Sequence, residues 1–347
     1  MKNYRDLFES TRKRLNPEDY LFDSSFTQEL ATISYSDVLK FIRLAMKGVE
    51  PEYTRRTREA GERVKDHLGA ELNTVEYKYQ GSVMTDTHIK GYSDIDLVVI
   101  SSKFYYYDLS RINEVLRSPS ESAKFNTTEI NRLVAETKGE SYSGDAHVDL
   151  RELRSQSESI LKSVYEACDT GHPKAIKITN KSLRRDVDIV IANWYDDVSS
   201  VVQQKGDYRG IQVYNKETNL RENPDYPFTS ILRINSRGSE TNGRLKKMIR
   251  FLKNVKSLSD YDINLTSFDI NAICYDIAVN DYQNAPFYDL VKILYGQLRS
   301  ICTNRDHANR LVSVDGREPI FLNNPEKLEN VKNILQEVES IYFDLNK

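Results

Sequence analysis

Apolar residues recur every three to four positions towards both ends of the chain, which is the spacing of an amphipathic helix. Residues 35–68 show this pattern, with an expected break near Pro51, after a mixed segment over residues 1–30. Beyond Thr229 the helical spacing returns. Helices are predicted there over residues 242–257, 268–279, 287–302 and 328–345.

The middle of the chain carries shorter apolar runs that predict strands. These runs cover residues 75–79, 94–101, 175–178 and 186–192. A helical pattern over residues 149–167 separates the second run from the third. Residues 203–230 are rich in Gly, Asn, Asp, Tyr and Pro and predict a hairpin and a crossing loop. A mixed sheet with helices, followed by a helical segment, is an α+β pattern.

The length of 347 residues exceeds what one hydrophobic core usually organises, so two lobes are expected. Residues 1–215 are assigned to a sheet-containing core with an N-terminal helix, and residues 216–347 to a helical C-terminal lobe. No apolar run approaches the ~20 residues of a membrane span. The charged start MKNYRDLFES also lacks the apolar region of a signal peptide. A cytoplasmic protein without membrane attachment is expected.

Charge and composition narrow the substrate class. The 49 basic and 52 acidic residues leave a formal net charge of −3, whereas proteins that grip long nucleic acid usually carry a basic excess. Small nucleotides are therefore favoured over duplex DNA or tRNA. Three cysteines (Cys168, Cys274, Cys302) and five histidines share no metal-ligand spacing, so they are expected to be structural or exposed.

Two carboxylates open the strand predicted at residues 94–101. Alternation places Asp94 and Asp96 on one face of the sheet and Ile95 on the other. The two acids are ~7 Å apart, from a rise of ~3.3 Å per residue, and repel each other. A cation is expected between them, and hard divalent ions such as Mg²⁺ prefer carboxylate oxygen and share it with substrate phosphates.

A second predicted strand also carries acidic residues, which strengthens the prediction of a cation site. Asp186 and Asp188 also share a face of their strand, and either could supply a third ligand. Three carboxylates can hold two metal ions. One ion would bind a triphosphate, and the other would lower the pKa of an attacking hydroxyl.

A Gly-Ser pair lies shortly before the first acidic strand, with Ser82 twelve residues ahead of Asp94. If Gly81-Ser82 forms a sharp turn that opens a helix, its backbone N–H groups and hydroxyl would attract phosphate. Gly-Ser alone is an ordinary turn, and Asp-x-Asp alone is often a solvated strand end. Their combination with a second acidic strand indicates a nucleotide site.

A basic row accompanies the predicted helix 242–257. Lys246, Arg250 and Lys253 fall on one face, apart from the apolar face. Such rows are usually solvated, yet beside a triphosphate they would neutralise charge and orient the leaving pyrophosphate. The run at residues 105–107 (Tyr-Tyr-Tyr) follows a predicted strand, is expected to lie in a loop and receives no function.

These motifs resemble the signature of the polymerase-beta-like nucleotidyltransferases. The likeness is closest to the bacterial CD-NTases, the cyclic-oligonucleotide synthases related to oligoadenylate synthase and cyclic GMP-AMP synthase. The residues that carry it are Gly81-Ser82, Thr87, Gly91-Tyr92-Ser93, Asp94-Ile95-Asp96-Leu97, Asp188-Ile189-Val190-Ile191-Ala192, and residues 241–245, 250–253 and 315–319.

The resemblance implies an α+β fold: a polymerase-beta-like nucleotidyltransferase core with a mixed β-sheet, a helical C-terminal lobe, and an active site in the cleft. It assigns catalysis and two Mg²⁺ or Mn²⁺ ions to Asp94, Asp96 and Asp188. Asp188 is preferred to Asp186 because it stands directly before the Ile-Val-Ile-Ala run. Nucleotide binding is assigned to four further residues, Gly81, Ser82, Arg250 and Lys253.

Three points qualify the resemblance. Asp149 lies in a stretch similar to a third-carboxylate strand, but a helical pattern follows it and it is interpreted as a residue of a helix start. The zinc-binding cysteine cluster of the animal DNA sensor has no counterpart, so activation by duplex DNA is not expected. The crossing loop at residues 215–230 lacks the Trp common in relatives.

The implied activity is synthesis of a cyclic or linear oligonucleotide second messenger from NTPs, with pyrophosphate release. The product would act on a separate effector protein in antiphage signalling. Two alternatives remain: transfer of a nucleotide to a tRNA, protein or small molecule, and a nucleotide-binding scaffold without catalysis. A regulatory protein partner also stays open.

Overall fold

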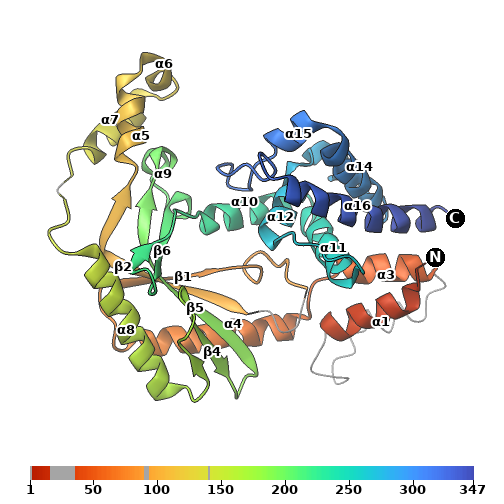
Figure 1. Cartoon of the computed structure of the whole chain (residues 1–347), viewed down its shortest axis with the longest axis horizontal. Coiled ribbons are helices and arrows are strands. Elements are labelled where there is room, and N and C mark those ends of the chain that lie inside the picture. Colours follow the sequence, from red (N-terminus) through yellow and green to blue (C-terminus); the bar gives the residue numbers. More distant parts are fainter. Residues whose placement is uncertain (1, 16–35, 90–93, 140) are drawn as a thin grey trace. The chain divides into compact units, whose positions relative to one another are not determined.

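The computed structural model describes residues 2–15, 36–89, 94–139 and 141–347. Its contacts divide the chain into two compact units (Figure 1). The sheet unit comprises Arg56–Gly81 and Asp94–Thr229; the helical unit comprises Met1–Arg55, Ser82–Ser93 and Ser230–Lys347. The expected boundary at residues 215/216 is a division along the sequence and stays a prediction.

A mixed sheet organises the sheet unit, as the strand pattern predicted. Its main path runs β1-β2-β5-β4-β3, and β6 pairs with the far part of β5 and with β7. Only the β2–β5 pair is parallel among the described pairings. The strands are β1 (Val75–Gln80), β2 (Ile95–Tyr107), β3 (Cys168–Asp169), β4 (Ala175–Asn180), β5 (Arg185–Asp196), β6 (Gly210–Asn215) and β7 (Leu220–Arg221).

The two central strands are longer than their apolar runs indicated. β2 continues past Ser101 through a register shift and pairs again with β5 from Tyr105 onwards. The prediction that Tyr105-Tyr106-Tyr107 forms a loop is therefore wrong. The three tyrosines are strand residues, because aromatic side chains suit a pleated, half-buried surface.

Helices cover the sheet on the side away from the acidic residues. A side chain at Gly61, on α4 (Pro51–Gly69), would meet Tyr79 and Ile95, so α4 lies on the Ile95 face. The helix α8 (Ala146–Val164), predicted at residues 149–167, contacts β2 and β5. Four short α-helices that lie wholly in the described part of the sheet unit were not predicted: α5 (Leu109–Arg117), α6 (Pro119–Ser122), α7 (Thr127–Glu136) and α9 (Val198–Gln203).

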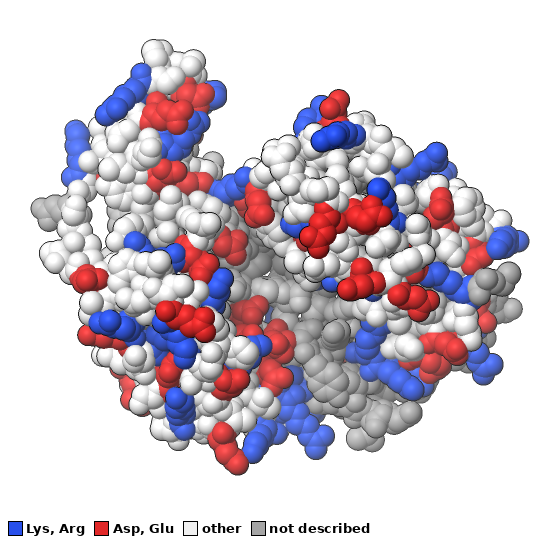
Figure 2. Space-filling view, viewed as in Figure 1, with Lys and Arg blue, Asp and Glu red and all other residues white. Residues whose placement is uncertain are grey.

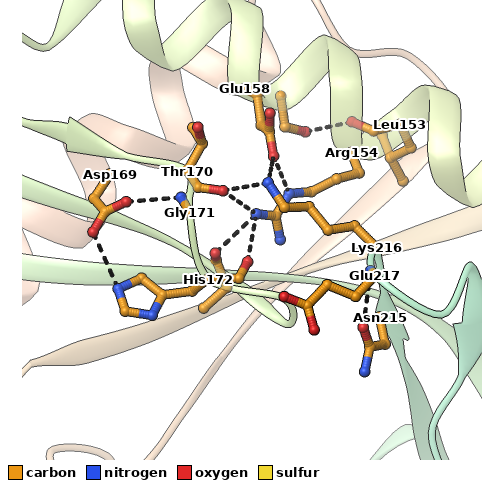
Figure 3. A network of polar contacts seen from close by, with 12 residues as sticks. Leu153, Arg154, Glu158, Asp169, Thr170, Gly171, His172, Asn215, Lys216 and Glu217 are labelled. Atoms are coloured by element: carbon orange, nitrogen blue, oxygen red, sulfur yellow. Dashed lines mark hydrogen bonds and ion pairs between the residues drawn. The ribbon is translucent and has the colours of Figure 1, made fainter.

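A buried arginine ties α8 to the loop that leads into β4 (Figure 3). Arg154 is only 2% exposed, and its Nε donates to Glu158 Oε1 at 2.7 Å. Its Nη2 donates to the carbonyl oxygens of His172 at 3.1 Å and Ala175 at 2.9 Å. Lys216 reaches the same Glu158 oxygen at 3.2 Å. This network fixes the chain at the entrance to β4.

The helical unit is built around α11 (Arg244–Leu258), which contacts α3, α12, α14 and α16. Its apolar residues, such as Leu245, Met248 and Leu252, are fully buried. The other described helices with residues in this unit are α1 (Tyr4–Leu15), α3 (Asp37–Met46), the first residues of α4, α10 (Pro227–Glu240), α12 (Ser267–Asp276), α13 (Val279–Tyr282), α14 (Asp289–Thr303), α15 (Arg305–Arg310) and α16 (Pro325–Leu345). The break expected near Pro51 separates α3 from α4, and Pro51 is the first residue of α4.

Charged side chains of both signs are interspersed over the face shown in Figure 2, as expected from the near-neutral net charge. Within the described part of the chain, no helix has both the length and the apolar content needed to cross a membrane. The three cysteines are free thiols.

Replacing Arg154 with Leu should lower the free energy of unfolding by about 2–4 kcal/mol. The substitution leaves Glu158 and two carbonyl oxygens without their buried donor. Urea unfolding would measure the loss, and hydrogen exchange should show faster opening of residues 170–176. Arg151→Leu is the control, because Arg151 is an exposed residue of the same helix. Equal effects of the two substitutions would contradict the structural role of Arg154.

Candidate active site

A row of polar side chains crosses four strands of the sheet. In the pairing of β1 with β2, Gln80 stands opposite Asp96. In the parallel pairing, Asp96 stands beside Asp188, and Asp188 in turn stands opposite Lys177 of β4. Residues paired directly across strands share a face, and neighbouring strands lie ~4.8 Å apart. The register therefore brings the acids of two distant sequence segments together.

Asp94 and Asp96 lie at the start of β2, on the face opposite the fully buried Ile95. Burial raises the pKa of Asp96 to about 7, and the neighbouring Asp188 and Asp94 add to the shift. Burial likewise raises the pKa of Asp94, with Asp188 and Asp186 contributing. Neighbouring carboxylates thus add to the effect of burial at Asp94 and Asp96, a pattern that is common at functional sites.

The structure places the two candidates for the third carboxylate differently. Asp188 is paired with Asp96, and its side chain is 18% exposed. Asp186 is exposed and lies two residues earlier on β5. Asp188 perturbs both Asp94 and Asp96, whereas Asp186 contributes to the shift of Asp94. This geometry supports the preference for Asp188.

Lys177 contributes a positive charge on the same face of the sheet as the acids of the row. Its Nζ lies 3.3 Å from Asp188 Oδ2. The same ammonium lowers the pKa values of Asp94 and Asp96 against the larger effect of burial. The Asp188 carboxylate raises the pKa of Lys177 in return. Sequence analysis missed this residue, because only the antiparallel register of β4 with β5 reveals it.

Gly81 ends the neighbouring strand in a conformation that other residues rarely adopt. Its φ is +88°, and a Cβ at this position would collide with Asp96 Oδ2. A side chain here would thus strain the backbone and displace the carboxylate. Glycine is required both by the turn and by the close approach of Asp96.

The predicted sharp turn is present after Gly81, but no helix opens there. Residues 82–86 form consecutive turns. The Ser82 carbonyl accepts hydrogen bonds from the Thr87 N–H at 3.0 Å and from the Thr85 hydroxyl at 3.2 Å. The expectation of a helix N-terminus at Ser82 is therefore wrong. The motif residues 91–93 (Gly-Tyr-Ser) lie outside the described residues.

Arg250 and Lys253 are buried within the helical unit, each only 7% exposed, so they are not part of a solvated row. Arg250 donates from Nε to the Met46 carbonyl at 2.8 Å and from Nη1 to the Asp86 carbonyl at 2.6 Å. Lys253 donates from Nζ to the Thr87 carbonyl at 3.2 Å. Both cations hold the backbone that follows the Gly-Ser turn.

Burial lowers the pKa of Lys253 to about 8. The third residue of the basic row, Lys246, instead donates to Asn235 Oδ1 at 2.8 Å. The three basic residues that share a helix face in the sequence pattern therefore have different contacts. Two of its members support one backbone segment, and the third contacts a different helix.

The acidic row fits a divalent cation by the chemistry of its donors. Asp94, Asp96 and Asp188 offer carboxylate oxygens, which hard cations prefer, and their mutual repulsion calls for positive charge. Across the described ranges, no three acidic, histidine or cysteine side chains are already gathered in the geometry of a metal site. Closing the carboxylates on a common ion would also require Asp188 to change partner from Lys177.

Asp149 lies elsewhere, as its interpretation as a helix-start residue predicted. It occupies the first turn of α8, where it pairs with Lys103 at 2.5 Å and accepts from the Tyr142 hydroxyl at 2.5 Å. Gln80 is a further residue that sequence reasoning missed. Its side-chain oxygen is buried and has no hydrogen-bond partner among the described residues, and Gln80 stands opposite Asp96.

Replacing Asp96 with Asn should stabilise the metal-free protein more at pH 8 than at pH 5. The unfolded chain ionises this group near 3.8, whereas the folded protein keeps its proton up to about pH 7. Between these values the folded state holds the extra proton, so the parent loses stability as pH rises through this window. Asparagine removes that loss. Thermal unfolding in EDTA at both pH values would measure the difference.

Asp186→Asn is the matched control for this experiment, because Asp186 shares the strand and the face of Asp188 but is exposed. Its substitution should change the melting temperature little at either pH. A stabilisation by Asp96→Asn that is the same at pH 5 and pH 8 would show that neither burial nor the neighbouring acids raise the pKa of Asp96.

Comparison with known proteins adds independent findings. The family model described as the cGAS/DncV-like nucleotidyltransferase C-terminal helical domain matches residues 233–343. A protein named c-di-GMP synthase from Capnocytophaga granulosa is 56% identical, covering 99% of this chain and 98% of the relative. Another c-di-GMP synthase, from Lachnospiraceae bacterium, is 42% identical over 99% of both chains.

The similarity extends to a solved three-dimensional structure. The STING-associated CdnE c-di-GMP synthase from Flavobacteriaceae sp. superposes with a TM-score of 0.90, at 37% identity over 99% of both chains. The predicted α+β nucleotidyltransferase fold is therefore confirmed, and the relatives do not support a scaffold without catalysis. The chain belongs to the bacterial CD-NTase family, and it is a nucleotidyltransferase that synthesises a cyclic nucleotide product.

Proposed function

We propose that this protein makes cyclic di-GMP from two molecules of GTP. Relatives that are 56% and 42% identical over nearly the whole chain carry this activity in their names. The observation that carries the proposal within the structure is the parallel pairing of β2 with β5, which sets Asp96 beside Asp188. A nucleotidyl transfer site needs carboxylates from separate segments at one place, and this pairing supplies them.

Asp94, Asp96 and Asp188 are proposed to hold two divalent ions, Mg²⁺ or Mn²⁺. When bound, such ions neutralise the donor triphosphate and lower the pKa of the attacking hydroxyl. The three carboxylates then position the reactants. One of the three carboxylates would accept the proton of the attacking hydroxyl.

The proposed reaction consists of two nucleotidyl transfers. In the first, a ribose hydroxyl of one GTP attacks the α-phosphorus of the other. The new ester bond forms as the bond to the β-phosphate oxygen breaks, and pyrophosphate leaves. In the second transfer, the hydroxyl at the other end of the linear intermediate attacks its remaining α-phosphorus. The ring closes and a second pyrophosphate is released.

Nucleotide binding is proposed for Gly81, Ser82, Arg250 and Lys253. The Gly81–Ser82 bond is where the chain passes from the acid-bearing sheet unit into the segment 82–89. Arg250 and Lys253 already donate to backbone oxygens of Asp86 and Thr87. We therefore assign the two cations an indirect role, in which they keep the turn that follows Ser82 in one conformation.

The product is proposed to act on a separate effector. The solved relatives from Capnocytophaga granulosa and Flavobacteriaceae sp. are described as STING-associated. A receptor of this type is the proposed reader of the cyclic dinucleotide, in antiphage signalling. A cytoplasmic location and a regulatory protein partner are also proposed.

Incubation with GTP and Mg²⁺ should yield a product that co-elutes with cyclic di-GMP and has its mass. Asp94→Asn, Asp96→Asn and Asp188→Asn should each lower the rate at least about 100-fold, since each removes a ligand or proton acceptor on which the transition state depends. Liquid chromatography with mass spectrometry, using all four NTPs in competition, would measure both outcomes.

Asp186→Asn serves as the control for these variants, and it should retain most of the activity. Circular dichroism would confirm that the inactive variants remain folded. The proposal fails if the protein forms no cyclic product from GTP with either Mg²⁺ or Mn²⁺. The alternative of a tRNA, protein or small-molecule acceptor would instead place the label from α-³²P GTP on that acceptor.

Lys253→Met should raise the KM for GTP about three- to tenfold while changing kcat less. Methionine fills the buried site, but it removes the donor to the Thr87 carbonyl and hydroxyl and so loosens the turn, at the usual strength of such hydrogen bonds. Steady-state release of pyrophosphate would measure both constants. Lys247→Met, on the same helix, is the control. An unchanged KM would remove Lys253 from the binding machinery.

A further inference from the structure

The polar row across the sheet ends in a cation. The row runs from Gln80 through Asp96 and Asp188 to Lys177, and each member is directly paired with the next across neighbouring strands. Lys177 therefore shares a face with the carboxylates. Its position is set by the backbone register of β4, which makes Lys177 a built-in member of the site.

The ammonium of Lys177 is engaged with a specific oxygen of the proposed metal site. Its Nζ lies 3.3 Å from Asp188 Oδ2, while the Lys177 side chain is 44% exposed. A lysine ammonium is a compact charge on a flexible four-carbon stem. The side chain can thus leave Asp188 by rotating towards solvent, without moving β4.

A divalent ion and this ammonium would compete for the same carboxylate. Two positive centres within ~4 Å of one another repel strongly where water is partly excluded. Asp188 is 18% exposed, so this repulsion would be only partly screened. A cation that binds between Asp96 and Asp188 must accordingly displace Lys177.

We propose that Lys177 is a positioning residue that acts as a resident counter-cation for Asp188 and weakens metal binding in the absence of nucleotide. This inference rests on the proposed function, in which Asp188 is a metal ligand. As a consequence, a divalent ion binds the site more readily when GTP is present. A GTP molecule that arrives with its own divalent ion brings additional phosphate ligands, and these offset the loss of the Lys177–Asp188 ion pair.

The test is to measure Mn²⁺ binding to the nucleotide-free protein by electron paramagnetic resonance. Lys177→Met should bind Mn²⁺ about two- to tenfold more tightly than the parent, because it removes a competing, partly exposed ion pair. Lys177→Arg should stay near the parent, since it keeps the charge. In EDTA, Lys177→Met should also melt at a lower temperature, and Mn²⁺ should raise that temperature more than it does for the parent.

Lys174→Met is the matched control. Lys174 lies three residues earlier and forms a similar ion pair, at 3.1 Å with Glu222, outside the polar row. Its substitution should leave the affinity for Mn²⁺ unchanged. The KM for GTP at saturating Mn²⁺ should also stay the same in Lys177→Met, because a counter-cation of Asp188 does not contact the phosphates.

Two results would overturn the inference. The first is an affinity for Mn²⁺ in Lys177→Met that equals or falls below that of the parent. The second is a large rise in the KM for GTP at saturating Mn²⁺, which would make Lys177 a phosphate-binding residue. The Asp188→Asn variant distinguishes a failure of the inference about Lys177 from a failure of the proposed function. If Asp188→Asn binds Mn²⁺ as well as the parent, the metal assignment falls and the inference falls with it.

Discussion

The parallel pairing of β2 with β5 is the constraint on which the site depends. These strands are separated by about ninety residues in the chain, and their hydrogen bonds set Asp96 beside Asp188. A shift of one residue would turn the carboxylates of one strand to the opposite face. Ile95, Leu97, Val187 and Ile189 are fully buried on that opposite face. Their burial opposes the shift, so the hydrophobic core fixes the geometry of the acids.

The acids are brought together at an electrostatic cost. Burial and repulsion raise the pKa of Asp96 to about 7, and Lys177 offsets only part of this effect. Acids with raised pKa values that lie close together are typical of functional sites. The cation beside these acids belongs to a lysine whose side chain is 44% exposed.

Buried cations hold the backbone at one place in each unit. Arg154 secures the loop that enters β4 and so supports the strand that carries Lys177. Arg250 and Lys253 secure the turn after Ser82. In both places the guanidinium or ammonium donates to backbone oxygens in a buried setting, where an unsatisfied carbonyl would be costly.

The sequence alone determined the local elements and the chemistry. Hydrophobic period predicted the strands β1, β2, β4 and β5 and seven of the described helices (α3, α4, α8, α11, α12, α14 and α16). Alternation placed Asp94 and Asp96 on one face. Both signals depend on neighbouring residues only. Sequence analysis failed at Tyr105-Tyr106-Tyr107, which pair with β5 as a strand, and after Ser82, where residues 82–86 form turns and no helix. Only the tertiary structure decided that Asp188 rather than Asp186 stands beside Asp96, that Lys177 completes the row, and that Arg250 and Lys253 are buried. These facts depend on strand register and helix packing, which join residues far apart in the chain and leave no periodic signal in it.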